Sequence, residues 1–99
     1  MTKPNVLSLR SLANWLAKQP ASKTFNYFDN EDCLLAQFFK AKGLKQVNVG
    51  SFEFSYSVKG ARQMAELPFS FREVGETEPR TFGNALKTAR KLLAQGEVA

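Results

Sequence analysis

Cys33, the only cysteine of this 99-residue sequence, is the side chain best suited to reactive chemistry. A thiolate is a nucleophile and a metal ligand, and it is stabilised at the start of a helix. Cys33 falls in the first turn of a predicted helix, but neighbouring carboxylates disfavour its anion. We therefore interpret Cys33 as a buried structural residue rather than as a nucleophile.

The neighbouring carboxylates belong to Asp29, Glu31 and Asp32. Paired carboxylates can support hydrolysis, and an acidic cluster can also hold a cation. A simpler role explains these residues fully, because a helix start favours a short capping side chain and negative charge in its first turn. We therefore assign them to helix capping.

The sequence contains no histidine. This removes the usual general base near neutral pH, the usual activator of a serine or cysteine nucleophile, and the commonest metal ligand. A zinc site would need several cysteine or histidine ligands, and neither a Gly-rich phosphate loop nor a dinucleotide fingerprint is present. We predict a protein that is not an enzyme, with no catalytic residues, no metal site and no cofactor.

Basic residues are the remaining candidates for function. Arg80, Lys87, Arg90 and Lys91 cluster at and along the last predicted helix, and the formal net charge is +5. They form either a solvated helix face or a contact for phosphate or an acidic protein. Trp15 is either a partly buried core aromatic or an anchor that faces a partner, since tryptophan is enriched at interface hot spots. These five residues are the candidate partner-binding set.

Apolar spacing predicts a central helix. It should begin at Asp29 or Asn30, whose short side chains can cap a first turn. Its apolar stripe, at three- and four-residue spacing, consists of Leu34, Leu35, Phe38 and Phe39. Gly43 should end the helix, with Leu44 where a Schellman motif places its apolar contact.

A two-stranded hairpin is predicted directly after this helix. Val47 and Val49 alternate with polar residues, as do the apolar residues of segment 52–58. Gly50-Ser51 fits a two-residue type II′ turn. It would pair Val49 with Phe52 and Val47 with Phe54, which places all four on one face. The opposite face, solvated or available to a partner, carries Gln46, Asn48, Glu53, Ser55 and Ser57.

Further strands are predicted on both sides of the hairpin. Phe25 and Tyr27 could form a short edge strand, and residues 61–66 could be a loop or a short strand. Alternation predicts a third sheet strand made of Leu67, Phe69 and Phe71. Pro68 restricts that strand to an edge, or marks its start.

A first helix is predicted over residues 9–18. Ser8 is its expected N-cap, and Leu7 can pack against Leu12 as a hydrophobic staple. Pro20 ends it.

The last helix is predicted over residues 82–95, after a polar loop at residues 74–79. Thr81 is its expected N-cap and Gly96 its stop. We expect this helix to pack on one face of the sheet.

The predicted fold class is α+β: a small antiparallel sheet of about three strands, two N-terminal helices and one C-terminal helix, in a single domain over residues 1–99. No segment approaches the roughly 20 apolar residues of a membrane span. Arg10 and Asn14 interrupt any apolar core of a signal peptide. We therefore expect a cytoplasmic protein with no membrane contact.

Several stretches resemble a known group of sequences. DNEDCLLAQFFKAKG followed by VNVG, and later RTFGNALKTAR, are similar to blocks of small uncharacterised proteins encoded by bacteriophages and prophages, in which an LANWL-type helix comes first. The matching residues are Leu12 to Leu16, Asp29 to Gly43, and Thr81 to Leu86. These motifs are short and mainly structural, so no site residue is carried over. The resemblance implies a phage accessory protein that binds a protein of its bacterial host.

Three functional hypotheses follow. The first is a small non-enzymatic phage protein that inhibits a host protein or complex by occlusion, for example an anti-CRISPR or other anti-defence inhibitor. The second is a nucleic-acid binder that contacts phosphates through the basic last helix. The third is a self-assembling protein that pairs through the edge of its third strand. The identity of the partner and the oligomeric state stay open.

Overall fold

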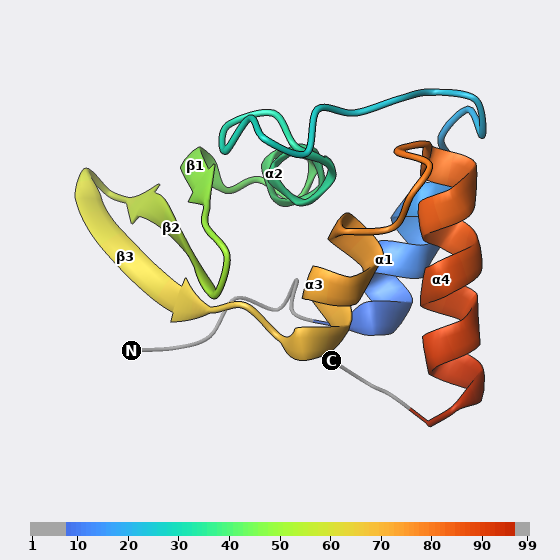
Figure 1. The fold of residues 1–99 in the computed structure, drawn as a ribbon. Helices are drawn as coiled ribbons and strands as arrows, with labels where there is room; N and C mark the ends of the chain where they lie inside the picture. The colour runs from blue at the N-terminus through green and yellow to red at the C-terminus, as the bar shows by residue number, and fades with distance from the viewer. Residues whose placement is uncertain (1–7, 97–99) are drawn as a thin grey trace.

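The computed structural model describes residues 8–96, which form four helices and three strands (Figure 1). In chain order the elements are α1 (Leu9–Ala17), α2 (Leu34–Ala41), β1 (Lys45–Val49), β2 (Glu53–Val58), β3 (Ala61–Glu66), α3 (Phe69–Gly75) and α4 (Phe82–Ala94). The strands make one antiparallel sheet in the order β1-β2-β3. The predicted α+β class, with two N-terminal helices and one C-terminal helix, is confirmed.

The predicted caps of the first and last helices are confirmed. The Ser8 hydroxyl accepts a hydrogen bond from the Ser11 backbone N–H at 3.4 Å, and the Thr81 hydroxyl accepts one from the Asn84 N–H at 3.3 Å. Each bond satisfies a backbone donor that the first helical turn leaves free. The staple expected from Leu7 lies outside the described residues.

The predicted C-terminal stop of α2 is also confirmed. Gly43 has a φ of +98°, the left-handed conformation that a Schellman motif requires at this position. The Leu44 N–H donates to the Phe39 carbonyl at 3.1 Å, and the Gly43 N–H donates to the Lys40 carbonyl at 3.0 Å. The partly buried Leu44 packs against the core from this position.

The predicted start of α2 is wrong. Cys33 is the N-cap residue and makes no side-chain capping bond, so residues 31–32 precede the helix and do not stand in its first turn. The Asp29 carboxylate instead accepts the Glu31 N–H at 3.0 Å in a turn. The physical reason is tertiary: the Asn30 carbonyl accepts the Val49 N–H of β1 at 2.9 Å, which holds this residue against the edge of the sheet.

The predicted hairpin register is wrong as well. Val49 pairs with Phe54 and not with Phe52. The turn is longer than predicted, because it spans residues 50–53 and is closed by a bond from the Gly50 N–H to the Glu53 carbonyl at 2.8 Å. Phe52 is left 67% exposed at the turn. Near the other end of β1, a bulge with Gln46 at φ +52° inserts one extra residue. The buried face that results consists of Val47, Val49, Phe54 and Tyr56.

The third strand lies earlier in the chain than the main prediction placed it. The ambiguous segment 61–66 forms β3, whereas Phe69 and Phe71 belong to α3. Lys59 and Gly60, at φ +51° and +83°, make the tight left-handed turn that brings β3 back along β2. Helical spacing buries Phe71 and Val74 in α3 and exposes Phe69. The alternation of apolar residues in segment 67–71 therefore led to a wrong prediction of a strand. Because α3 ends at Gly75, the predicted loop at 74–79 starts later.

Two predicted packing arrangements are also wrong. The segment of Phe25 and Tyr27 forms no strand; its neighbour Thr24 makes a single isolated bridge with Thr81. α4 packs against α1 and α3, and α2 is the helix that lies against the sheet. Figure 1 shows this division, with the sheet and α2 on one side and α1, α3 and α4 on the other.

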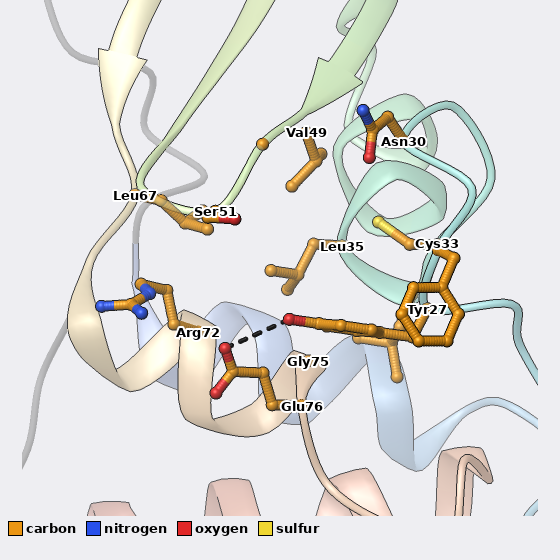
Figure 2. A pocket seen from close by; sticks show the side chains of 13 residues that line it. Tyr27, Asn30, Cys33, Leu35, Val49, Ser51, Leu67, Arg72, Gly75 and Glu76 are labelled. Atoms are coloured by element: carbon orange, nitrogen blue, oxygen red, sulfur yellow. Dashed lines mark hydrogen bonds between the residues drawn. The ribbon is translucent and has the colours of Figure 1, made fainter.

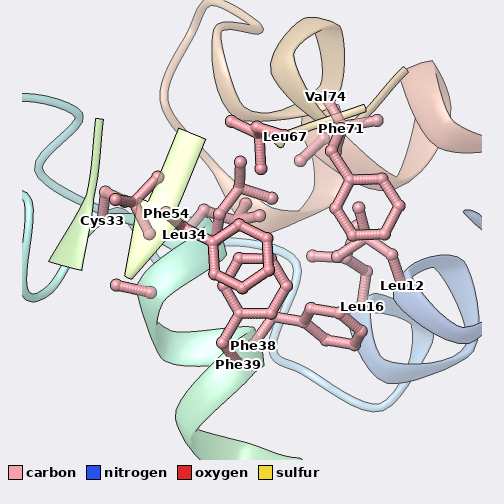
Figure 3. Close-up of a cluster of buried hydrophobic side chains, with 14 of the residues drawn as sticks. Leu12, Leu16, Cys33, Leu34, Phe38, Phe39, Phe54, Leu67, Phe71 and Val74 are labelled. Atoms are coloured by element: carbon pink, nitrogen blue, oxygen red, sulfur yellow. The ribbon is translucent and has the colours of Figure 1, made fainter. Parts of the chain in front are cut away.

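The core joins the two sides through adjacent aromatic residues of α2 (Figure 3). Phe39 stacks on Phe54 of β2, with ring centroids 4.2 Å apart and planes 14° from parallel. Phe38 meets Trp15 of α1 edge-to-face at 5.6 Å, and both Phe38 and Phe39 contact Phe71 of α3. Neighbouring residues of a helix point about 100° apart, so one short helix can hold both the sheet and the helices.

We expect Phe39→Ala to destabilise the fold strongly, by about 3–5 kcal/mol, because it removes a fully buried ring and leaves a cavity. Phe28→Ala is the matched control, since Phe28 is 83% exposed and should change stability by less than about 0.5 kcal/mol. Urea unfolding of the two variants measures the difference. Equal losses would show that α2 does not hold the core together.

Candidate functional site

A pocket of about 320 Å³ lies between α2, the β1–β2 turn and α3. Figure 2 shows Leu35 near its centre, with Tyr27, Val49, Leu67 and Arg72 around it. Such a volume is at the lower end for a small-molecule site. Sequence reasoning missed this pocket, because the pocket depends on α3 and the sequence predicted a strand there.

Tyr27 and Glu76 are the lining residues of this pocket whose side chains are joined by a hydrogen bond. The Tyr27 hydroxyl donates to the Glu76 carboxylate at 3.2 Å (Figure 2). The Arg80 guanidinium carbon lies over the face of the Tyr27 ring, 4.3 Å from its centroid. The pKa of the Tyr27 phenol is raised above its ordinary 10.0, first by burial and then by the negative charge of Glu76. Tyr27 is therefore a neutral hydrogen-bond donor here.

Cys33 lines the same pocket but is buried, with 7% of its surface exposed. Burial raises the pKa of its thiol above the ordinary 9.0, although backbone N–H groups at the start of α2 act in the opposite direction. The result is a neutral thiol in an apolar wall, which agrees with a structural role. Within residues 8–96, no three His, Cys, Asp or Glu side chains gather closely enough to hold a metal ion.

Three of the five candidate partner-binding residues share one helix surface. Lys87, Arg90 and Lys91 are exposed on α4, at spacings of three and four residues that bring neighbouring side chains together. Each projects into solvent from a helix whose other face packs on α1 and α3. They form a cationic stripe on the outer side of α4.

The other two candidates lie elsewhere. Arg80 is half-buried against Tyr27, and one guanidinium nitrogen, Nη1, is buried with no hydrogen-bond partner. Trp15 is also half-buried, and its ring lies 5.6 Å from both Phe38 and Phe82. The position of Trp15 fits a partly buried core aromatic better than an anchor that faces a partner.

The charges of the described residues are separated in space. We call residues 8–27 and 80–96 the basic layer. It contains α1 and α4, which pack against each other. The segment that follows α1 lies along the start of α4, where the Phe82 N–H donates to the Lys23 carbonyl. This layer has no carboxylate side chain, and its seven cationic side chains are Arg10, Lys18, Lys23, Arg80, Lys87, Arg90 and Lys91. Residues 28–79 carry eight carboxylates and six cations, a net charge of −2.

An exposed apolar patch was also missed by the sequence reasoning. Phe52, Met64 and Phe69 are 67%, 56% and 63% exposed, and they line a second hollow with Arg72. The Arg72 guanidinium carbon lies 4.5 Å from the Phe52 ring centroid. The available signal was the spacing of Leu67, Phe71 and Val74, which suits a helix with Phe69 off its buried face.

Comparison of the chain with protein-family models, with curated proteins and with solved structures gives no match.

None of the helices in the described part of the chain is both long and apolar enough to cross a membrane.

We expect Cys33 to react with a thiol reagent more than about tenfold more slowly in the folded protein than in urea, at a pH below 9.0, because both access and ionisation are suppressed. Ser51→Cys in a Cys33→Ala background is the control. It places a thiol in an exposed turn and should react at nearly the unfolded rate. Equal rates at the two positions would show that Cys33 is accessible.

We expect the Tyr27 phenolate to appear at a midpoint above pH 10.0 in a Tyr56→Phe background, followed by phenolate absorbance. Glu76→Gln should lower that midpoint, because it removes a negative charge and replaces a charged acceptor of the phenol proton by a weaker, neutral one. The raised pKa means that the folded state holds this proton more tightly. Its stabilising effect is therefore complete below pH 10.0 and is lost as pH rises through the raised value. An unchanged midpoint would refute the coupling.

Proposed function

We propose that this chain is a non-enzymatic binding protein that covers an acidic surface of a host protein or complex with its basic layer and so inhibits that partner. The resemblance to phage accessory proteins implies this mode of action inside a bacterial host cell. An anti-CRISPR or other anti-defence inhibitor is one specific form of it.

The observation that supports this proposal is the charge separation. The basic layer has seven cations and no carboxylate, although the rest of the described chain is slightly acidic. The described residues carry a net charge of +5, and an even distribution would make both parts mildly positive, whereas residues 28–79 are negative and the basic layer carries all of the excess positive charge. A surface of one sign instead attracts a partner of the opposite sign, accelerates encounter and disfavours partners of like charge.

The cationic stripe of α4 is the best-formed part of this surface. Lys87, Arg90 and Lys91 extend from a 13-residue helix that is fixed on α1 and α3, so their attachment points are rigid. Exposed charges of this kind influence the association rate more than the final affinity, and salt screens them over about 8 Å at physiological ionic strength. Binding should therefore weaken as salt is raised.

Nucleic acid is the second candidate, because phosphates would meet the same cations. The surroundings of the stripe favour a protein. Single-strand binders place aromatic rings beside their cations, whereas the exposed rings here, Phe28, Phe52 and Phe69, lie outside the basic layer. The solvent face of the sheet carries Ser55 and Ser57 where an RNA-binding sheet would present aromatic residues.

We expect the double variant Arg90→Glu/Lys91→Glu to lose partner binding by about tenfold or more, because it reverses the charge of the stripe. Lys45→Glu/Lys59→Glu is the matched control: it makes the same change in net charge on exposed residues outside the basic layer, and it should retain binding. Affinity purification from bacterial lysate, with and without nuclease, compares both variants with the parent chain.

Three outcomes are decisive. A partner that survives nuclease and is lost only with the α4 variant supports the proposal. Loss of recovery on nuclease treatment shifts the function to nucleic acid, with a steep salt dependence as its signature. A partner that both variants retain, or no near-stoichiometric partner at all, contradicts a role for the basic layer.

A further inference from the structure

The two edges of the sheet are protected unequally. At the β1 edge, the Val49 N–H already donates to the Asn30 carbonyl, and the bulge at Gln46 interrupts regular pairing. β3 is the other edge, and Figure 1 shows it as the outermost element on the side of the sheet away from α2. Its six residues, Ala61–Glu66, pair with β2 in unbroken register. A regular edge strand of this length is a template for another strand.

The turn that precedes β3 determines which backbone groups face outward. Lys59 and Gly60 form a two-residue turn, so the flanking Val58 and Ala61 are a hydrogen-bonded pair. Along an antiparallel strand, every second residue bonds to the neighbouring strand, so Ala61, Gln63 and Ala65 bond to β2. The Leu67 N–H continues this series with its bond to the Phe52 carbonyl at 2.8 Å. The outward N–H and C=O groups of β3 therefore belong to Arg62, Met64 and Glu66.

We propose that a second copy of this chain pairs with the outer edge of β3, which no strand of residues 8–96 covers, antiparallel and in a register centred on Met64. In this register each outward N–H of one copy faces an outward C=O of the other, because Met64 faces Met64 and Arg62 faces Glu66 of the second copy. The interface is isologous, so it closes as a dimer and leaves no free β3 edge.

The side chains support the same register. Arg62, Met64 and Glu66 lie on the solvent face of β3, since Ala65 is the buried residue of the strand. Residues that face one another across an antiparallel pair interact directly, and the two-fold register brings opposite charges together at both ends of the interface. A shift of two residues would place Arg62 opposite Met64, or opposite Pro68, which has no N–H.

The chain by itself leaves Glu66 beside a like charge. Glu66 pairs with Glu53 of β2, and two carboxylates in directly opposite positions destabilise a strand pair. Arg62 of the second copy would supply a cation on the other side of Glu66. In the single chain the Arg62 guanidinium lies on this same face and donates to Ser55 at 2.6 Å, Ser57 at 3.1 Å and the Gln46 carbonyl at 2.6 Å, so pairing with Glu66 of the second copy requires its side chain to turn from β2 toward the outer edge of β3.

Apolar surface adjoins the proposed interface. Met64 is 56% exposed and lines a hollow with Phe52 and Phe69, which are also exposed. Methionine and phenylalanine are enriched in protein interfaces. A second Met64 placed on this strand would cover part of that patch, which supplies an apolar contribution in addition to the backbone bonds.

This inference does not depend on the proposed function. Figure 1 shows α4 on the side of the molecule opposite β3, so a β3 dimer leaves the cationic stripe exposed. Reversing the charge of the stripe should not change self-association, and a monomeric variant should keep the cationic stripe unchanged.

The first test exploits the symmetry of the charges. Arg62→Glu or Glu66→Arg alone places like charges opposite one another in a self-pair, so each variant should sediment as a monomer at concentrations where the parent chain is a dimer. An equimolar mixture of the two variants restores both attractive pairs and should sediment as a heterodimer. Lys45→Glu, which changes the β1 edge, is the control and should remain a dimer.

The second test reports the register. In a Cys33→Ala background, Met64→Cys should form an intermolecular disulfide on mild oxidation, because residues that face one another across a hydrogen-bonded pair have Cα atoms about 5.5 Å apart, within disulfide range. Arg62→Cys should not, since its own copy across the axis lies four residues away along the strand. Circular dichroism of each variant checks that it is folded.

The outcomes separate clearly. Dimeric parent chain, heterodimer rescue and a crosslink at position 64 only support the proposal. A parent chain that stays monomeric at high micromolar concentration overturns it. A dimer that both charge variants retain, or crosslinking at position 62 instead of position 64, also overturns it, because the copies would then meet through another surface or register.

Discussion

The packing of Phe38 and Phe39 is the interaction on which the rest of the fold depends. These adjacent residues of α2 point in different directions, Phe39 onto Phe54 of the sheet and Phe38 onto Trp15 of α1. α3 completes the junction through Phe71, which contacts both rings. α2 has only eight residues, so its stability comes from this packing rather than from its length.

Among residues 8–96, this arrangement leaves two surfaces without an intramolecular partner. α4 is held from one side by α1 and α3, which turns its cations outward, and β3 is held from one side by β2, which leaves its other edge free. Neither surface takes part in the core. The two therefore can serve separate interactions, one electrostatic and one based on backbone pairing.

Local features of the fold could be predicted from the sequence, whereas contacts between distant residues could not. Features decided within a few residues were predicted correctly: the caps at Ser8 and Thr81 and the Schellman stop at Gly43. Each depends on one side chain or one backbone conformation close to the helix end. The exposed positions of Lys87, Arg90 and Lys91 follow equally from helical spacing, although sequence could not show that Arg80 stacks on Tyr27.

The sequence by itself determined the fold class, the N-caps of α1 and α4, the stop of α2 and the absence of histidine, because composition and local hydrogen bonding suffice for these. The tertiary structure alone decided where α2 begins, how the hairpin pairs, and that residues 69–75 form a helix. The reason is that these choices depend on distant partners. A β1 amide binds Asn30, the bond from the Gly50 N–H to the Glu53 carbonyl sets the pairing at the turn while the bulge at Gln46 changes it at the far end of β1, and burial against α2 and α4 selects a helical over an alternating pattern in α3.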